Sequence, residues 1–341
     1  MLTLTKKGLY CRAGDFYIDP SGAVDTAVVT HAHSDHARRG SKKYYCALSG
    51  TGLIKARLGK NIVVGGVPYG ENFWLGPVKV SFHPAGHILG SAQVRLEYDG
   101  EVWLASGDYK RESDPTCEPF EVVPCDVFVT EATFGTPTYV WKKNSNVAEE
   151  IAQWWKQNAA KGTNSVLFAY SLGKTQRVLG ILEPYAKKKI YCHSAARELN
   201  QCYESQGIKL APHCYLDEFE NGSEDSGDQK LTGELLIVPP SFLKSPQAEI
   251  LHNDFETAFA SGWMATRRPE YSQGGPDRGF VISDHADWND LVQTIQETGA
   301  RRVYVQHRGH GALVRHLKGL GLKAFPDSHL APANPDQLSF L

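Results

Sequence analysis

Short apolar runs broken by turn-forming residues fill the first part of the chain. Residues 16–18 and 27–29 are two of these runs, and residues 127–130 close the series. Short apolar runs bounded by polar turn residues are typical of buried strands. The pattern therefore predicts a strand-rich region that extends to about Glu131.

Beyond this region the spacing of apolar residues changes to that of a helix. Asn146 can cap a helix, and Gly162 lies where that helix should end. The apolar positions share one face: Val147, Ile151, Trp154 and Trp155. Residues 165–170 then have the pattern of a buried strand, so this part of the chain predicts alternating helices and strands.

A strand-rich pattern returns from about Arg278. Asp287 can cap a further helix, and residues 301–305 predict the strand that follows it. The order of elements predicts an α/β protein in which one domain is inserted into another. The expected parts are a core over residues 1–140, an insert over 141–275, the second part of the core over 276–330 and a tail over 331–341.

Composition is that of a globular enzyme. The chain has 341 residues, of which 41% are hydrophobic and 22% charged, enough for one large core or two. Its seven cysteines are scattered, odd in number and form no Cys-x-x-Cys pair, which argues against a disulfide framework and a thiolate zinc site. No apolar stretch predicts a membrane helix or a secretion signal, so we expect a cytoplasmic protein with no membrane partner.

A formal net charge of −2 excludes a protein that coats nucleic acid non-specifically, because such binding depends on neutralising phosphates. An enzyme needs only a local basic groove. The candidates for one are Arg38, Arg39, Lys42, Lys43, Lys110, Arg111, Lys142, Lys143, Arg267 and Arg268. Residues 187–189 are also basic, but a solvated surface explains that run of lysines.

The most informative motif is His-x-His-x-Asp-His, which follows the apolar run 27–29. It places four potential metal ligands, His31, His33, Asp35 and His36, within six residues. On an extended stretch His31 and His33 point to the same side, while a turn beyond them can present Asp35 and His36 to a neighbouring point. This arrangement predicts two metal ions, such as those that hydrolyse phosphodiesters in pairs.

The motif resembles the metallo-β-lactamase superfamily. That resemblance implies an αββα sandwich with two divalent metal ions at one edge of its sheets. It also implies that Asp19 orients the ligands, that His87 completes the first site with His31 and His33, and that Asp108 bridges both metals. Zinc suits the nitrogen and oxygen ligands, and manganese or iron are alternatives.

Three further residues resemble the nucleic-acid-cutting β-CASP branch, in which a domain interrupts the core. Glu131 resembles its acidic motif A, and His285 its motif B, a histidine that can protonate the leaving oxygen. His307 resembles motif C and would join Asp35 and His36 on the second metal. The resemblance thus assigns catalytic roles to Asp19, Asp35, Glu131 and His285. His307 is a feature of the branch's RNA-processing members, whereas its DNA nucleases usually carry an apolar residue there.

Longer strings resemble the bacterial ligase-associated DNA exonucleases more closely. They are residues 14–20, 83–87 and 107–111. This resemblance implies a DNA-repair exonuclease, with single-strand endonuclease activity as an option, that works beside an ATP-dependent DNA ligase and a helicase. The alternatives are an RNA-processing β-CASP nuclease and a catalytically silent scaffold that binds nucleic acid or a sliding clamp.

Two weaker motifs complete the sequence predictions. Ser171, Gly173 and Lys174 lie between a predicted strand and helix, where backbone amides can bind a substrate phosphate. The last five residues, Gln337 to Leu341, resemble the peptide with which replication proteins bind the sliding clamp, although Phe340 and Leu341 reverse the usual order. Frayed or core-capping apolar residues explain this ending equally well.

Overall fold

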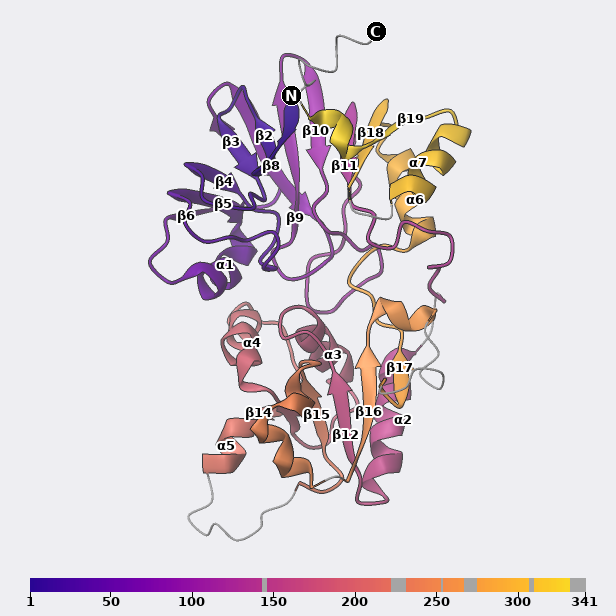
Figure 1. Cartoon of the computed structure of the whole chain (residues 1–341). Coiled ribbons are helices and arrows are strands. Elements are labelled where there is room, and N and C mark those ends of the chain that lie inside the picture. Colours follow the sequence, from indigo (N-terminus) through magenta and orange to yellow (C-terminus); the bar gives the residue numbers. More distant parts are fainter. Residues whose placement is uncertain (143–145, 222–230, 253, 267–274, 307–309, 332–341) are drawn as a thin grey trace. The chain divides into compact units, whose positions relative to one another are not determined.

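Two units make up the computed structural model of this chain, which Figure 1 shows. Unit 1 combines Met1–Tyr139 with His285–Leu341, and unit 2 is Val140–Asp284. The structure describes residues 1–142, 146–221, 231–252, 254–266, 275–306 and 310–331. Among these, no helix has both the length and the apolar surface needed to cross a membrane.

The first sheet of unit 1 contains six strands in sequence order, with the antiparallel pairs β1–β2 and β2–β3 followed by parallel pairs. Its strands are β1 (Leu2–Thr5), β2 (Gly8–Cys11), β3 (Phe16–Ile18), β4 (Thr26–Val28), β5 (Lys43–Ala47) and β6 (Val64–Val67). Helix α1 (Thr51–Leu58) connects β5 to β6. The alternation of buried and half-buried residues in β2 and β3 explains why this sheet covers a core with one face.

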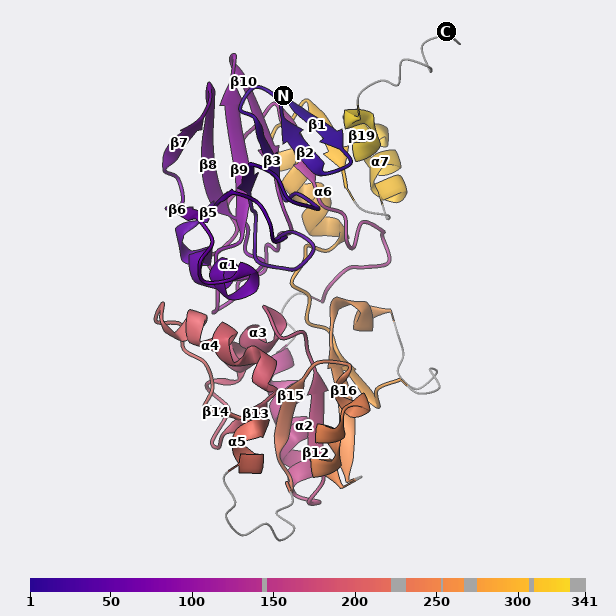
Figure 2. The same cartoon turned by 60° about the vertical axis from the view of Figure 1, so that its left-hand side comes forward.

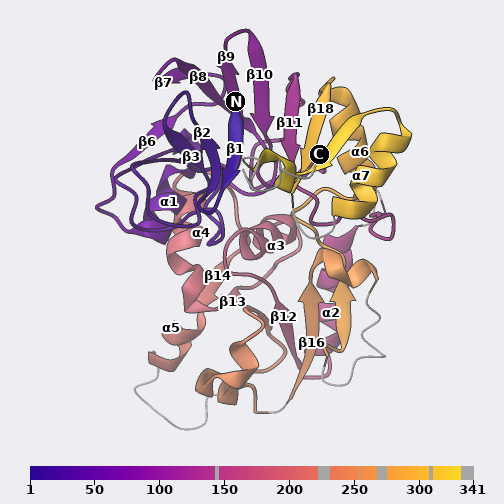
Figure 3. The same cartoon turned by 45° about the horizontal axis from the view of Figure 1, so that its top comes forward.

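The second sheet of unit 1 has seven strands in the order β19-β18-β11-β10-β9-β8-β7. Its strands are β7 (Asn72–Leu75), β8 (Val78–Pro84), β9 (Ala92–Tyr98), β10 (Glu101–Ala105), β11 (Val127–Thr130), β18 (Arg302–Val305) and β19 (Lys323–Pro326). Strand β18 pairs in parallel with β11, with Val127 opposite Arg302. The residues that follow unit 2 therefore add strands β18 and β19 to a sheet whose other strands come from the residues before unit 2, as Figure 3 shows.

The two sheets of unit 1 face each other across a shared apolar core. Phe16 and Val28 of the first sheet and Val94 and Val129 of the second belong to one buried cluster. A second cluster joins the other face of the second sheet to helices α6 (Trp288–Glu297) and α7 (His310–Gly319). The layered arrangement, visible in Figure 2, is the sandwich that the sequence predicts.

Unit 2 has one sheet of six parallel strands in the order β14-β13-β15-β12-β16-β17. The strands are β12 (Asn164–Phe168), β13 (Ile190–Cys192), β14 (His213–Tyr215), β15 (Leu235–Val238), β16 (Phe255–Ala260) and β17 (Arg278–Phe280). The helices are α2 (Val147–Ala159), α3 (Lys174–Leu182), α4 (Arg197–Glu204) and α5 (Leu216–Asn221). Buried apolar clusters cover both faces, which explains the continuous apolar sequence of β15 and the burial of every residue of β12.

The predicted helix caps are present in both units. The side chain of Asn146 accepts a hydrogen bond from the amide of Glu149 at the start of α2, at 3.2 Å. Asp287 does the same for the amide of Asp290 in α6, at 2.8 Å. Each cap satisfies one of the amides that a helix start leaves without a partner.

The second boundary between the units differs from the sequence prediction. Strand β17 pairs with β16, with Gly279 opposite Phe259, so this strand belongs to the sheet of unit 2. The chain returns to unit 1 at His285 rather than at residue 276. The sequence does not show which sheet this strand joins, because a buried strand has the same pattern in either sheet.

Candidate metal centre

The residues of the His-x-His-x-Asp-His motif lie where the chain leaves β4. A tight turn follows His33, because the amides of His36 and Ala37 both donate to its carbonyl oxygen, at 3.1 and 2.8 Å. The turn returns the ring of His36 to the ring of His31, with centroids 4.0 Å apart. A turn therefore brings together imidazoles that are five positions apart in the sequence.

Asp108 lies just beyond β10, in a loop that packs against the residue before His31. Gly107 has a φ of +56°, and a Cβ atom at this position would lie 2.7 Å from the Cβ atom of Thr30. Only glycine meets both the left-handed backbone and the close approach. This contact places the Asp108 loop against the histidine loop.

His87 comes from the loop between β8 and β9. The amide of His87 donates to the Ser91 hydroxyl at 3.1 Å, and the amide of Lys110 donates to the carbonyl of Ala85 at 3.0 Å. The second bond connects the His87 loop to the loop that carries Asp108. Three separate loops thus supply the side chains of one cluster.

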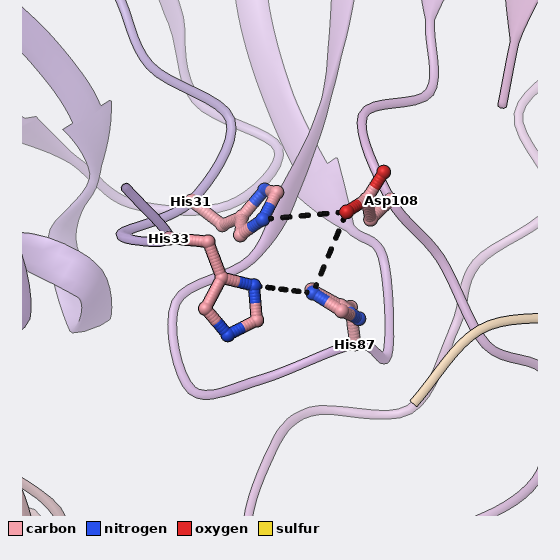
Figure 4. Close-up of side chains that lie close together, drawn as sticks. All are labelled: His31, His33, His87 and Asp108. Carbon is pink, nitrogen blue, oxygen red and sulfur yellow. Dashed lines mark hydrogen bonds and ion pairs between the residues drawn. The ribbon is translucent and has the colours of Figure 1, made fainter. Parts of the chain in front are cut away.

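Four imidazole nitrogens surround one carboxylate oxygen, Oδ2 of Asp108. They are His31 Nε2 at 3.6 Å, His36 Nε2 at 3.5 Å, His87 Nε2 at 3.8 Å and His285 Nδ1 at 4.0 Å. Figure 4 shows His31, His33, His87 and Asp108 converging, and all four offer ligand atoms within 4.8 Å of one another. Nδ1 of His33 lies 3.0 Å from Nε2 of His87.

This set of donors fits a divalent metal ion. Nitrogen ligands about 2.1 Å from a tetrahedral metal lie about 3.4 Å from one another, close to the separations found here. Among the described residues, Nε2 of His31 and Oδ1 of Asp108 have no hydrogen-bond partner, and both residues are buried, at most 5% exposed. A buried polar atom without a partner costs free energy, which a bound metal ion would recover at His31 Nε2.

His36 lies between two further carboxylates. Its Nδ1 contacts Oδ2 of Asp19 at 2.7 Å, and its Nε2 lies 3.8 Å from Oδ2 of Asp35. The Asp35 side chain is 70% exposed, so it borders the cluster on the solvent side. These residues and Asp108 could hold a second ion. His307, the remaining ligand predicted for it, lies outside the described residues.

Thr30 supports the cluster, and the sequence analysis did not include it. Its amide and hydroxyl donate to the two carboxylate oxygens of Asp19, at 2.8 and 2.6 Å, and its hydroxyl lies 3.0 Å from Nδ1 of His31. Asp19 itself has a φ of +45°, a strained backbone that these bonds maintain. Asp19 thus orients His31 through Thr30 and His36 directly. In the sequence, the position of Thr30 immediately before the motif could have indicated this supporting role.

Glu131 and His285 form a second group with Asp108. Nδ1 of His285 lies 3.0 Å from Oε2 and 3.2 Å from Oε1 of Glu131, which is 1% exposed. The amide of Tyr109 donates to Oε1 of Glu131 at 2.6 Å. The amide of Tyr109 therefore fixes the carboxylate of Glu131, and that carboxylate orients the imidazole of His285.

The charges of the cluster are strongly coupled. Burial and the neighbouring imidazoles of His36 and His87 lower the pKa of His31 well below its usual value, which favours the neutral form that binds metals. Burial opposes the charge on His36, but Asp108 and Asp19 outweigh it and raise the pKa of His36 well above the usual value. Burial also opposes ionisation of Asp108, yet His36 and His285 hold the pKa of Asp108 well below its usual value.

The predicted phosphate site lies in unit 2, and its lysine has other contacts. Nζ of Lys174 donates to the carbonyl of Ile282 at 2.7 Å and forms an ion pair with Asp284 at 2.8 Å, and Lys174 is 4% exposed. Gly173, with a φ of +84°, is the N-cap of α3, and its amide donates to the side chain of Gln176. Phosphate binding by Ser171, Gly173 and Lys174 stays a prediction.

Two of the expected basic side chains form ion pairs with acidic residues of the chain. Lys110 is 2% exposed and forms a buried ion pair with Asp114 at 2.5 Å. Arg111 contacts Glu297 at 2.6 Å. The sequence prediction was wrong for Lys110, because its aliphatic chain and its partner acid four residues later allow burial. Lys143, Arg267, Arg268 and the peptide from Gln337 to Leu341 lie outside the described residues.

Comparisons with known proteins find relatives of this chain among nucleases and one ligase-named protein. A protein named "Probable DNA ligase" from Opitutus terrae is 30% identical over 321 residues, which cover 93% of this chain and 30% of that protein. An "RNase J-like protein" from Methanocaldococcus jannaschii is 27% identical over 81% of this chain and 79% of its own length. "Endoribonuclease YSH1" from Saccharomyces cerevisiae is 31% identical over 35% of this chain and 15% of its own.

The fold is also found among solved structures. A protein of unknown function from Enterococcus faecalis V583 superposes with a TM-score of 0.55 at 12% identity, over 84% of this chain and 76% of that one. No protein-family model matches the chain. The chain spans less than a third of the ligase-named relative. The relatives support a place for this chain in the metallo-β-lactamase superfamily and its β-CASP branch, and the solved structure supports the fold.

Proposed function

We propose that this protein is a metal-dependent nuclease that hydrolyses phosphodiester bonds in DNA. The observation that carries the proposal is the convergence of four imidazoles on Asp108. Buried atoms of His31 and Asp108 also have no hydrogen-bond partner in the described part of the chain. His31, His33 and His87 would hold one divalent ion, and Asp35, His36 and His307 a second, with Asp108 shared between them. Zinc is the expected metal, and manganese or iron are alternatives.

Bound ions would supply charge stabilisation at the scissile phosphate and a lowered pKa for the attacking water. Side chains of the protein would deliver the proton and orient the ligands. His285 is held by Glu131 at 3.0 Å and lies 4.0 Å from Asp108, so it can deliver a proton to the leaving oxygen beside the cluster. Thr30 and Asp19 maintain the orientation of His31 and His36.

DNA is the proposed substrate because of the relative from Opitutus terrae. Its printed name is that of a DNA ligase, and this chain matches about a third of its length. We propose that the chain acts as an exonuclease in DNA repair, beside a ligase and a helicase, with single-strand cleavage as a further activity. The peptide from Gln337 to Leu341 is proposed to bind a sliding clamp.

A second candidate function is RNA processing. The names of the relatives from Methanocaldococcus jannaschii and Saccharomyces cerevisiae are those of ribonucleases. His307 resembles the histidine that RNA-processing members of the branch carry. The substrate, DNA or RNA, is therefore the first property to measure.

The test compares end-labelled single-stranded DNA and RNA of the same sequence, each incubated with the protein and added zinc or manganese. An Asp108→Ala variant serves as the matched control. We expect DNA shortened from one end by the intact protein alone. Preferential cleavage of RNA would favour the second candidate function, RNA processing. Equal amounts of product from the intact protein and from the variant would refute the metal-dependent nuclease.

A further inference from the structure

Exposed apolar side chains of unit 2 gather at one edge of its sheet. Among the described residues of this unit, six large apolar side chains are exposed, and four of them follow the carboxyl ends of neighbouring strands. These four are Tyr170 after β12, Leu243 after β15, Trp263 after β16 and Val281 after β17. In an open parallel sheet, this edge is where ligands bind.

Two of the four are aromatic and follow adjacent strands. Tyr170 is 58% exposed and Trp263 is 42% exposed. Strands β12 and β16 pair with Phe168 opposite Phe259, and the ring of Tyr170 packs edge-on against the ring of Phe259, with centroids 6.5 Å apart. The two exposed rings therefore belong to one edge, on strands about 4.8 Å apart.

The backbone holds both rings in place. The carbonyl of Tyr170 accepts hydrogen bonds from the amide and the hydroxyl of Thr175, at 3.1 and 2.9 Å. The hydroxyl of Ser261 accepts a bond from the amide of Trp263 at 3.3 Å, and the amide of Ser261 donates to the carbonyl of Phe280 at 3.1 Å. Fixed backbones reduce the entropy that either ring would lose on binding a ligand.

A short stretch of chain joins the sheet of unit 2 to the proposed catalytic group. Phe280 ends β17 opposite Ala260 of β16. His285, which belongs to the group of Asp108 and Glu131, follows five residues later. Five residues span at most about 18 Å.

We infer that Tyr170 and Trp263 form a stacking platform for unpaired bases of single-stranded nucleic acid, an inference that rests on the proposed nuclease function. The face of every base can stack on an aromatic ring, so such a platform tolerates any sequence. Paired bases inside a duplex offer no free face. The platform therefore selects single strands.

The test measures equilibrium binding of fluorescein-labelled oligonucleotides to the full chain by fluorescence anisotropy, with a chelator present to prevent cleavage. One oligonucleotide is oligothymidylate, and its partner has the same length but only abasic sites. Tyr170→Ala and Trp263→Ala are compared with Tyr170→Phe and Trp263→Phe, which keep a ring. Trp74→Ala is the matched control, because Trp74 is 64% exposed but lies on β7 in unit 1.

Loss of a stacked base typically weakens binding about fivefold to a hundredfold. We expect each alanine variant to lose affinity for oligothymidylate in this range and none for the abasic strand, while both phenylalanine variants and Trp74→Ala bind as the unchanged chain does. Equal losses on both oligonucleotides, or no loss, would overturn the platform. Base-dependent binding by a chain that cleaves neither DNA nor RNA when loaded with metal would refute the nuclease and keep the platform.

Discussion

One buried polar cluster in unit 1 and one in unit 2 differ in how their groups are paired. In the unit 1 cluster, Nε2 of His31 and Oδ1 of Asp108 are buried and have no hydrogen-bond partner among the described residues. In unit 2, Lys174 and Arg177 are equally buried, but both contact Asp284 and donate to backbone carbonyls. A cluster whose charged groups pair with one another stabilises a fold. A cluster that leaves ligand atoms without partners can bind a metal ion or another ligand.

The largest effect should follow from removing the shared carboxylate of unit 1. We expect Asp108→Ala to lower the rate of phosphodiester hydrolysis at least about a thousandfold, the upper range for losing one preorganised electrostatic contact. The same variant should lose bound metal, because Asp108 lies within 4.0 Å of four imidazole nitrogens. Elemental analysis and a labelled-strand assay measure both. Full metal content in the variant would contradict the shared role.

The next effect separates chemistry from metal binding. Replacing His285 by alanine, or Glu131 by glutamine, should lower kcat about a hundredfold to ten-thousandfold, the usual contribution of a general acid. Metal content should stay unchanged, because Nδ1 of His285 and Oε2 of Glu131 contact each other, at 3.0 Å. Single-turnover rates and elemental analysis test this. Loss of metal together with activity would make them ligands.

A smaller effect is expected from the residue that orients the ligands. Asp19 accepts bonds from Thr30 and lies 2.7 Å from Nδ1 of His36. Asp19→Asn should weaken metal affinity about tenfold to a hundredfold, as is usual for partners of metal-binding histidines. Competition with a fluorescent chelator measures the affinity. An unchanged affinity would show that Thr30 and the turn after His33 suffice to orient the rings.

The smallest effect on catalysis should come from unit 2, where stability should change instead. Lys174→Met leaves the buried Asp284 without one of its cations, which typically costs about 3–5 kcal/mol. We expect a lower free energy of unfolding in denaturant and unchanged metal content. If stability is unchanged but binding of a 5′-phosphorylated strand is lost, Lys174 serves the phosphate and the contrast between the units disappears.

The candidate metal centre and the surfaces around it differ in how far the sequence predicts them. The resemblance to metallo-β-lactamase and β-CASP motifs put His31, His87, Asp108, Glu131 and His285 in one group. Each of these residues lies in a loop that follows a strand. Loops that follow strand ends meet at one edge of a sandwich, so residues at these positions are expected to lie close together.

Other features depend on contacts between segments distant in sequence. Lys110 looks exposed in the sequence, but Asp114 and a close-packed loop bury it. Lys174 resembles a phosphate ligand, yet its partner Asp284 stands 110 residues later. The antiparallel pair β1–β2 was not predicted either, although the four residues of β1 alternate between leucine and threonine.

The most direct test of the account is a calorimetric titration of zinc or manganese into the chelated protein, with Asp108→Ala as its control. The account predicts that the protein binds two ions per chain and that its thermal unfolding temperature rises as they bind. The variant should bind at least tenfold more weakly, or about 1.4 kcal/mol. If neither metal binds, or if the variant binds as the intact protein does, the cluster around Asp108 is not a metal centre.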